Sequence, residues 1–403
     1  MRVTEWKVVR QVLGVLAAFV FVLNTCSLAS LQAQNDSLPP HLELFAGATM
    51  GSSAMPPWVL MGVVFGGDIT APLAVTVDRT DAGGRGFVGG QAEAGILMAW
   101  KNKMGHSVRM GVTSRAWTDF RWSPGTAHLL WGPLGGADPE NQERNLEDTQ
   151  LQGLATSAFT LGIASECVSV LGRVGEAHWG ANGAIEDAPF YMDSAQIEFR
   201  VEGQFNRSIA TGLMAGFDVE IRGVVEGEQN TINWAAGLRD VGGYIFPQWV
   251  ESVIDTSLNS TGWPLITEAL LGEGADSGPF SPSDGLQVDT LDAGTSDKTM
   301  QGSLPTTYYF RVNTQGWTAQ LQLNRWAPRP ELYAIKTFGH RSVNRPLNWS
   351  AGLGWGGWGG LYIPFGLDLK GKEGRTLTVK TRIAPGADLG LRTTLMCSWV
   401  KKF

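Results

Sequence analysis

The sequence predicts an all-β fold, a transmembrane antiparallel up-and-down β-barrel of about 14 strands (roughly 12 to 16) with a long polar extracellular loop. Three observations predict it: an amino-terminal export signal, long runs that alternate between apolar and polar residues, and an aromatic residue at the end of the last strand. Beyond the amino-terminal region, no apolar stretch reaches the roughly 18 residues that a transmembrane helix requires.

The first 33 residues have the layout of a cleavable signal peptide. Basic residues come first, an uncharged apolar run from Val12 to Leu23 follows, and small and polar residues end the segment. As a helix this run is too short for a hydrocarbon core of about 30 Å, which disfavours a retained anchor. We therefore predict a signal peptide over residues 1–33 and a barrel over residues 34–403, located in the cell outer membrane.

Several segments alternate without a break. From Ala195 to Phe205 the odd positions are apolar or small and the even positions polar, and after residues 206–208 the pattern restarts from Ile209 to Ile221. We interpret this pair as a hairpin with a minimal turn at 206–208, and predict further hairpins at 102–105 and 314–316. Such lengths fit tilted membrane strands of about 9–11 residues better than a soluble sandwich, the competing interpretation.

The last strand and the longest link complete the predicted barrel. From Leu391 to Phe403 apolar and polar residues alternate, and a terminal aromatic strand residue is typical of barrels whose last strand closes against the first. Residues 251–302 are rich in Gly, Ser, Asp and Thr. We predict that they form a long polar loop outside the cell.

The polar faces of the alternating strands carry charges of both signs. The lumen-facing candidates are Arg109, Arg115, Asp119, Arg121, Glu198, Arg200, Glu202, Asp218, Glu220 and Arg222. Opposite charges on neighbouring strands favour pairs that brace a narrow lumen, each contributing a few tenths to about 1 kcal/mol. The alternative is that these residues line a permeation path.

No pattern in the sequence is typical of an enzyme. The five His residues lie in or near predicted loops and strand ends, and none has a nucleophile and an orienting acid at a recognisable spacing. The Gly-rich segment 352–357 opens no helix, which favours a tight turn over a phosphate loop. We predict no catalytic, cofactor-binding or metal-binding residues and no cofactor. A net charge of −7 disfavours nucleic acid as a partner.

Three segments carry a resemblance to known proteins. Residues 233–246, 303–312 and 347–354 resemble segments of a family of Bacteroidetes outer-membrane barrels of unassigned function, and the Ala33-Gln34 pair looks like the cleavage region of a Bacteroidetes signal. The resemblance implies a monomeric barrel loosely related to fatty-acid-porin-like proteins and similar to the barrel accessories of gliding and type IX secretion. It implies no catalytic residues.

Two functions from different classes follow. The first is passive transport of small or hydrophobic solutes, because a barrel of about 14 strands is wider than the eight-strand kind that side chains fill. The apolar stretch Val59–Phe65 is then a candidate plug or wall segment. The alternative is a non-enzymatic structural or partner-docking barrel of a surface secretion or gliding apparatus. The expected partners are outer-membrane lipid and either a small hydrophobic solute or a secretion or motility protein.

Overall fold

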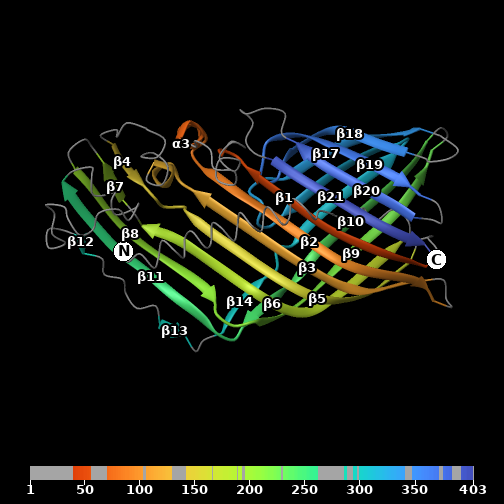
Figure 1. The fold of residues 1–403 in the computed structure, drawn as a ribbon, viewed down its shortest axis with the longest axis horizontal. Coiled ribbons are helices and arrows are strands. Elements are labelled where there is room, and N and C mark those ends of the chain that lie inside the picture. The colour runs from red at the N-terminus through yellow and green to blue at the C-terminus, as the bar shows by residue number, and fades with distance from the viewer. Residues whose placement is uncertain are drawn as a thin grey trace.

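The chain forms a closed antiparallel β-barrel of 14 strands, so the predicted fold class and strand number are confirmed (Figure 1). A computed structural model describes residues 40–55, 70–102, 106–128, 142–165, 167–187, 189–192, 196–227, 230–261, 286–287, 294–296, 299–340, 347–371, 375–383 and 392–402. The predicted signal peptide and the segment Val59–Phe65 lie outside these residues.

The barrel has one wall of long strands and one of shorter strands. The tall wall contains β2 (Gly86–Lys101), β3 (Ser107–Trp122), β5 (Gln150–Ala164), β6 (Val168–Asp187), β8 (Gln196–Ser208), β9 (Gly212–Glu226), β10 (Thr231–Phe246) and β11 (Trp249–Thr261). The short wall contains β15 (Thr307–Thr314), β16 (Trp317–Asn324), β17 (Glu331–His340), β18 (Leu347–Gly356), β19 (Leu361–Lys370) and β20 (Arg375–Ile383). Strands β2, β3 and β5 have 15 or 16 residues, whereas β15 and β16 have eight.

The remaining elements join the two walls or lie in the links. They are β1 (His41–Ser52), β4 (Gln142–Asn145), β7 (Pro189–Met192), β12 (Leu286–Gln287), β13 (Gly294–Ser296), β14 (Met300–Ser303), β21 (Arg392–Lys402) and the helix α3 (Thr70–Gly83), which precedes β2. Over the described ranges, no helix is long and apolar enough to cross a membrane.

Pairing between the first and last strands closes the barrel, as predicted. β1 pairs with β2 on one side and with β21 on the other, in a register that places His41 opposite Lys402. A closed ladder leaves no unpaired edge. The turns after β2, β9 and β15 lie at the same end as His41 and Lys402, which we call the turn end. The links after β1, β3, β16 and β18 lie at the opposite end, the link end.

β8 and β9 form one interrupted strand, so the predicted hairpin at 206–208 is wrong. β6 pairs with β9 through its first half and with β8 through its second half, and both partners run antiparallel to it. The hairpin turn lies instead between β9 and β10, where the Gly227 N–H donates to the Asn230 carbonyl at 2.9 Å. The residues at 206–208 favour a turn, but they mark only the break between β8 and β9. The hairpins predicted at 102–105 and 314–316 are confirmed by the β2–β3 and β15–β16 pairs.

The segment predicted as a loop from 251 to 302 begins and ends in strands. β11 continues β10 and pairs with β8 as far as Thr261. At its other end, β14 begins at Met300 and pairs with β10. The prediction overlooked these ends because the polar residues of this segment lie in strands that pair with strands remote in sequence. Most of residues 262–298, apart from β12 and β13, lie outside the described part.

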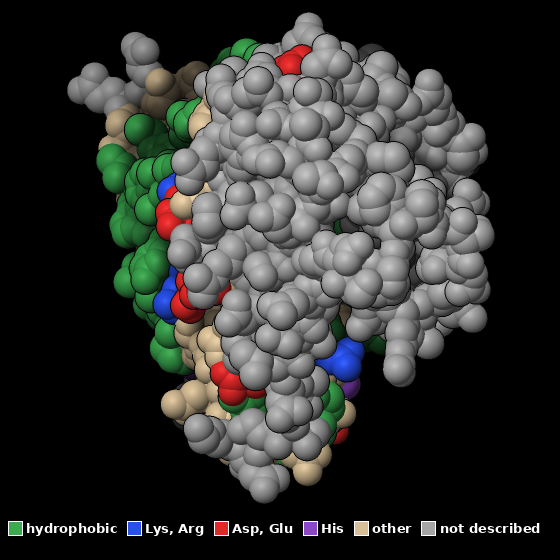
Figure 2. Space-filling view, turned by 90° about the vertical axis from the view of Figure 1, so that its left-hand side faces the viewer, with side chains coloured by type: hydrophobic (Ala, Val, Ile, Leu, Met, Phe, Trp, Pro, Cys, Tyr) green, Lys and Arg blue, Asp and Glu red, His purple; other side chains and the backbone are tan. Residues whose placement is uncertain are grey.

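The outer face of the barrel is apolar. On β5, Phe159, Leu161 and Ile163 are half exposed. Ala158 and Thr160, which alternate with them along the strand, are buried. The same outward side of neighbouring strands carries Ile96, Val112, Val174, Leu213, Phe217 and Leu353. Figure 2 shows hydrophobic side chains along one flank at the link end, with charged side chains inward of them. This closed ladder with an apolar exterior is the arrangement of an outer-membrane barrel.

Candidate functional site

A β-bulge in β10 turns two consecutive charged residues toward the lumen. The register between β9 and β10 shifts between Leu238 and Val241, and Asp240 has a φ of 57°. Because a bulge interrupts the alternation of side chains, Arg239 and Asp240 both reach interior partners. Thr306 supports the bulge by donating to the Asp240 carbonyl at 3.1 Å. Aspartate is among the residues that adopt this left-handed conformation most readily.

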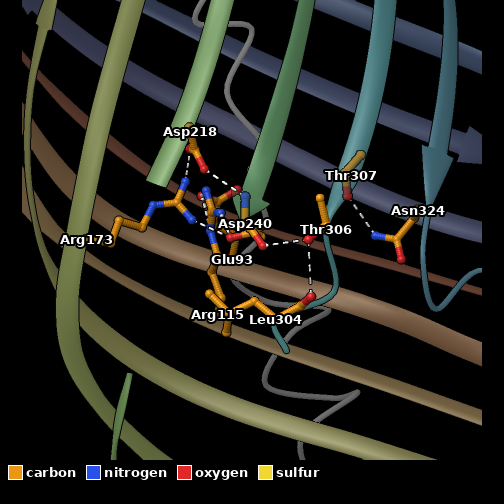
Figure 3. A network of polar contacts seen from close by, with 9 residues as sticks. All are labelled: Glu93, Arg115, Arg173, Asp218, Asp240, Leu304, Thr306, Thr307 and Asn324. Atoms are coloured by element: carbon orange, nitrogen blue, oxygen red, sulfur yellow. Dashed lines mark hydrogen bonds and ion pairs between the residues drawn. The ribbon is translucent and has the colours of Figure 1, made fainter. Parts of the chain in front are cut away.

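Asp240 is the centre of a buried ion network that crosses the barrel (Figure 3). This network, the Asp240 network, consists of Glu93 on β2, Arg115 on β3, Arg173 on β6, Asp218 on β9 and Asp240. Oδ1 of Asp240 accepts from both arginines, and its backbone N–H donates to Asp218 at 2.8 Å. β3 and β10 are separated by β5, β6 and β9 in the ladder. The Arg115–Asp240 pair therefore spans the lumen and braces it.

A second buried group, the Glu220 cluster, lies nearer the turn end on β9, β10 and β15. Its carboxylate accepts from Arg222 and from the Tyr309 hydroxyl. Nη2 of Arg311 lies 3.5 Å from Oε2 of Glu220. The Arg239 guanidinium lies 4.9 Å from the centroid of the Tyr309 ring. The cluster thus gathers two guanidinium groups at one carboxylate and a third over the ring of the tyrosine that donates to it.

A third interior group belongs to the short wall. Glu331 accepts from the Tyr362 hydroxyl at 2.6 Å and from Arg382 at 2.5 Å. The Arg382 guanidinium lies 5.3 Å from the Tyr333 ring centroid and 5.4 Å from that of Tyr362. Because the carboxylate is shared by a phenol and a guanidinium, the charge on this wall is neutralised locally.

An apolar layer fills the lumen on the link-end side of the Asp240 network. It is formed by Trp117, Leu154, Ala158, Ala177, Met214, Tyr244, Phe246, Met300, Leu304, Trp326 and Trp358. Most of these side chains come from the tall wall and from the segment before β15. Trp326 and Trp358 come from the short links after β16 and β18. The links of the short wall therefore fold over the mouth and pack on the tall wall.

Asp119 and Arg121 hold these two links in place. Nε1 of Trp358 donates to Asp119 at 3.2 Å, and Arg121 donates to the other oxygen of Asp119 at 2.7 Å and to the Trp326 carbonyl at 2.8 Å. Gly89 leaves room for the indole, since a Cβ at this position would lie 2.3 Å from the Trp358 ring. The apolar layer is thus closed by side chains carried on links and anchored to one strand.

The ten residues predicted to face the lumen are distributed unevenly over these groups. Arg115 and Asp218 belong to the Asp240 network, and Glu220 and Arg222 belong to the Glu220 cluster. Asp119 and Arg121 hold the links. Arg109 lines a cavity beside the Glu220 cluster. Glu202 lies on β8, opposite Asp255 of β11. The side chains of Glu198 and Arg200 lie outside the described part. That the ten line a permeation path stays a prediction.

Sequence reasoning missed several central residues of the lumen. Arg239 and Asp240 break the alternation, and the Gly242-Gly243 pair beside them is the one signal of a bulge. The inward faces of β6 and β15 carry Arg173 and Arg311 together with apolar or aromatic residues. The sequence therefore shows no regular polar face in these two strands. No group of three or more His, Cys, Asp or Glu side chains in the described ranges is arranged to hold a metal ion.

Comparisons with known proteins find similarity only to solved structures. No protein-family model and no curated protein matches the chain. Among solved structures it is similar to a mutant of TodX described as a monoaromatic hydrocarbon channel (7% identity, TM-score 0.40, 94% of this chain and 96% of that one). It is also similar to the β domain of the Bordetella autotransporter BrkA (11%, 0.27, 91% and 100%) and to a triple-mutant porin of Rhodopseudomonas blastica (8%, 0.22, 89% and 99%). Similarities at this level carry no argument about the solute. The resemblance to Bacteroidetes barrels stays a prediction.

Proposed function

We propose that this protein is a passive transport barrel for small hydrophobic solutes. The observation that supports the proposal is the apolar layer at the link end of the lumen, which is closed by Trp326 and Trp358. Both tryptophans lie on links outside the strand ladder. Their movement breaks the hydrogen bonds to Asp119 and Arg121 and leaves the strand ladder intact, and an apolar solute can take their place against Trp117 and Leu154.

The Asp240 network lies next on the path from the apolar layer to the turn end. Arg173 is 2% exposed and pairs with Asp218 and Asp240, although its Nε has no hydrogen-bond partner among the described residues. Breaking such a buried pair is costly, so the network forms a barrier that remains shut while the links are closed. A transport cycle would require the solute to pass beside this network, along the face where the short wall contributes neutral Gln320 and Tyr333.

The direct test is solute uptake by proteoliposomes that contain the full chain and an outer leaflet of lipopolysaccharide, because phospholipid alone dissolves and admits an apolar solute. We expect uptake of toluene above that of protein-free vesicles and no comparable uptake of glucose, because the apolar layer selects against a polar solute. Trp326→Ala should increase the rate. Equal rates with and without the protein, for both solutes, would refute transport.

A docking role is the second candidate. The observation that favours it is the length of β8 and β11, which pair with each other over their whole extent. Their outermost residues, near Gln196 and Thr261, lie beyond the last pair of β5 and β6 at the link end (Figure 1). An extended ribbon of this kind offers a surface to another protein. Stoichiometric recovery of one partner by a tagged chain, together with no solute uptake, would favour this role over transport.

A further inference from the structure

Two buried polar atoms at the margin of the apolar layer lack a hydrogen-bond partner. They are Nε1 of Trp249, at the start of β11, and Oδ1 of Asn206, on β8. Both atoms are shielded from water, and neither forms a hydrogen bond within the part of the chain that the structure describes. A buried donor or acceptor without a partner is unfavourable, and native proteins retain few of them. A molecule that binds between these two atoms would satisfy both.

The strand register places the two side chains on one face of the β8–β11 pair. Trp249 is opposite Ser208, and Asn206 is opposite Glu251. Residues directly opposite one another share a face, and so do residues two positions apart in one strand. Trp249 and Asn206 are therefore diagonal neighbours, whose Cα atoms lie about 7–8 Å apart in such a pair. Side chains at this spacing can both contact one small group.

This face looks into the lumen beside the link that closes the mouth. The side chain of Trp249 packs against the buried residues of the apolar layer, and so does that of Ala327. Ala327 follows Trp326 on the link after β16. A solute that displaces this link would lie with its apolar body against the layer and with one end toward Trp249 and Asn206. The route to these two residues therefore rests on the proposed function.

The chemistry of the two atoms defines the group that fits between them. The indole N–H only donates, and the amide oxygen of Asn206 only accepts. A neutral hydroxyl matches both, because its O–H donates while its oxygen accepts. A carboxylate cannot donate to Asn206, and it is repelled by Glu251, which lies on the same face and accepts from Gln204. An ether satisfies only the indole, and a hydrocarbon satisfies neither atom.

We propose that Trp249 and Asn206 bind the hydroxyl group of an otherwise apolar solute, such as a phenol. The indole of Trp249 donates to the hydroxyl oxygen, the hydroxyl donates to Asn206, and the apolar body of the solute contacts the apolar layer. The two residues form a hydroxyl subsite at the entrance of the proposed route. A hydrocarbon can pass the same route, but a hydroxylated solute of the same shape binds more tightly there.

Equilibrium binding of p-cresol and p-xylene to the purified full chain tests the hydroxyl subsite. The two molecules have nearly the same shape, and the hydroxyl of p-cresol takes the place of one methyl of p-xylene. Isothermal titration in detergent, with protein-free micelles as the blank, gives the ratio of the two affinities. Detergent dissolves the two molecules unequally, but it does so equally for every variant. The change in the ratio on substitution therefore reports the hydrogen bonds of the subsite.

Two variants and a matched control locate the subsite. Trp249→Phe keeps an aromatic ring but removes the N–H, and should lower the preference for p-cresol about fivefold or more. Asn206→Leu removes the acceptor and should have a similar effect, which keeps the test decisive if Trp249→Phe fails to assemble. Trp349→Phe makes the same exchange on the outer face and should leave the ratio unchanged. An unchanged ratio in both lumen variants would overturn the subsite and assign the two atoms to bound water.

The hydroxyl subsite and the proposed function fail in different ways. Uptake of toluene by the parent, together with the same affinity ratio in the parent and both lumen variants, overturns the subsite and leaves transport intact. A preference for p-cresol that both lumen variants lose, together with no uptake of toluene, supports the subsite and overturns transport. A parent that binds neither p-cresol nor p-xylene overturns the subsite, whatever its uptake of toluene.

Discussion

Trp358 and Asp119 join opposite walls of the barrel although they are 239 positions apart in the chain. The indole Nε1 donates to Oδ1 of Asp119 at 3.2 Å, and the carboxylate is 2% exposed. Oδ2 accepts from Arg121 at 2.7 Å. The link after β18 is therefore fixed to β3 by one directed hydrogen bond and by packing of the indole in the apolar layer. Removal of that side chain should loosen the mouth more than the strand ladder.

Trp358→Ala should raise the ion conductance of the barrel in planar bilayers. The loss of a buried tryptophan costs about 3–5 kcal/mol of packing and leaves a gap at the mouth. Trp349→Ala is a matched control, since Trp349 lies on the outer face and stacks on Phe338 with ring centroids 4.1 Å apart. Its conductance should equal that of the parent. An equal rise in both variants would show that Trp358 does not close the lumen.

Gly89→Val should also raise the ion conductance, although Gly89 lies on β2 in the wall opposite the link that carries Trp358. A Cβ at Gly89 would lie 2.3 Å from the Trp358 ring and 2.7 Å from the Thr118 carbonyl, so the indole must leave its seat. The Thr118 carbonyl belongs to the backbone of β3, so the β2–β3 pair must also shift locally, and the rest of its register should persist because valine is favourable in strands. The measurement is conductance together with the heat-modifiable gel shift. A normal gel shift with unchanged conductance would contradict the position that we assign to the Trp358 side chain.

Asp240→Asn and Asp240→Ala should separate charge from backbone conformation. Both remove the charge shared by Arg115 and Arg173, which should cost about 3–5 kcal/mol because buried cations lose their partner. Asn adopts a φ of 57° readily, whereas Ala pays a further ~1 kcal/mol or more in this conformation. Urea unfolding followed by gel shift should therefore rank the parent above Asn and Asn above Ala. Equal midpoints for the two variants would mean that the left-handed φ of residue 240 costs alanine no more than asparagine.

The sequence predicts the barrel well because its strands obey a local rule. Apolar and polar residues alternate along β3, β9 and β16, and lipid outside and polar groups inside enforce that period. Chain length then sets the number of strands. The pairing of the strands was predicted less well than their presence, since the hairpin predicted at 206–208 does not form. Which strand lies beside β8 depends on β6 and β11, and neither is specified by the residues near Ser208.

The interior groups were harder to predict because they are built from exceptions to that rule. Asp240 reaches the lumen only through the register shift in β10. Trp358 lies on a link whose glycines predict a tight turn, and Gly356 and Gly357 do have positive φ values of 101° and 67°. The turn was thus predictable, but its direction was not. It folds inward because Gly89 leaves space for the indole and Gly51 leaves space for the backbone of Trp358 and Gly359, and both glycines are remote in sequence.

Phe217→Arg should impair assembly, whereas Glu220→Gln should not. Phe217 is 43% exposed on the outer face, and an arginine that faces lipid costs roughly 2–4 kcal/mol near the midplane. Glu220 faces the lumen, and a glutamine keeps one acceptor oxygen for Arg222 while its amide N–H can donate to the hydroxyl oxygen of Tyr309. The fraction of heat-modifiable protein in membranes measures assembly. Equal fractions would mean that the inner and outer faces of β9 are exchanged.

Replacement of residues 262–285 by a short Gly-Ser linker should leave the barrel assembled, since loop closure depends only weakly on length. A replacement that continues to residue 300 should behave differently. It removes β12, β13 and Met300, which is buried in the apolar layer and pairs with Phe246 at the start of β14. The loss of that side chain alone should cost about 2–5 kcal/mol. Met300→Ala in the full chain is the control for this contribution. If the shorter replacement abolishes the heat-modifiable form while Met300→Ala retains it, residues 262–285 are required for assembly and this expectation is wrong.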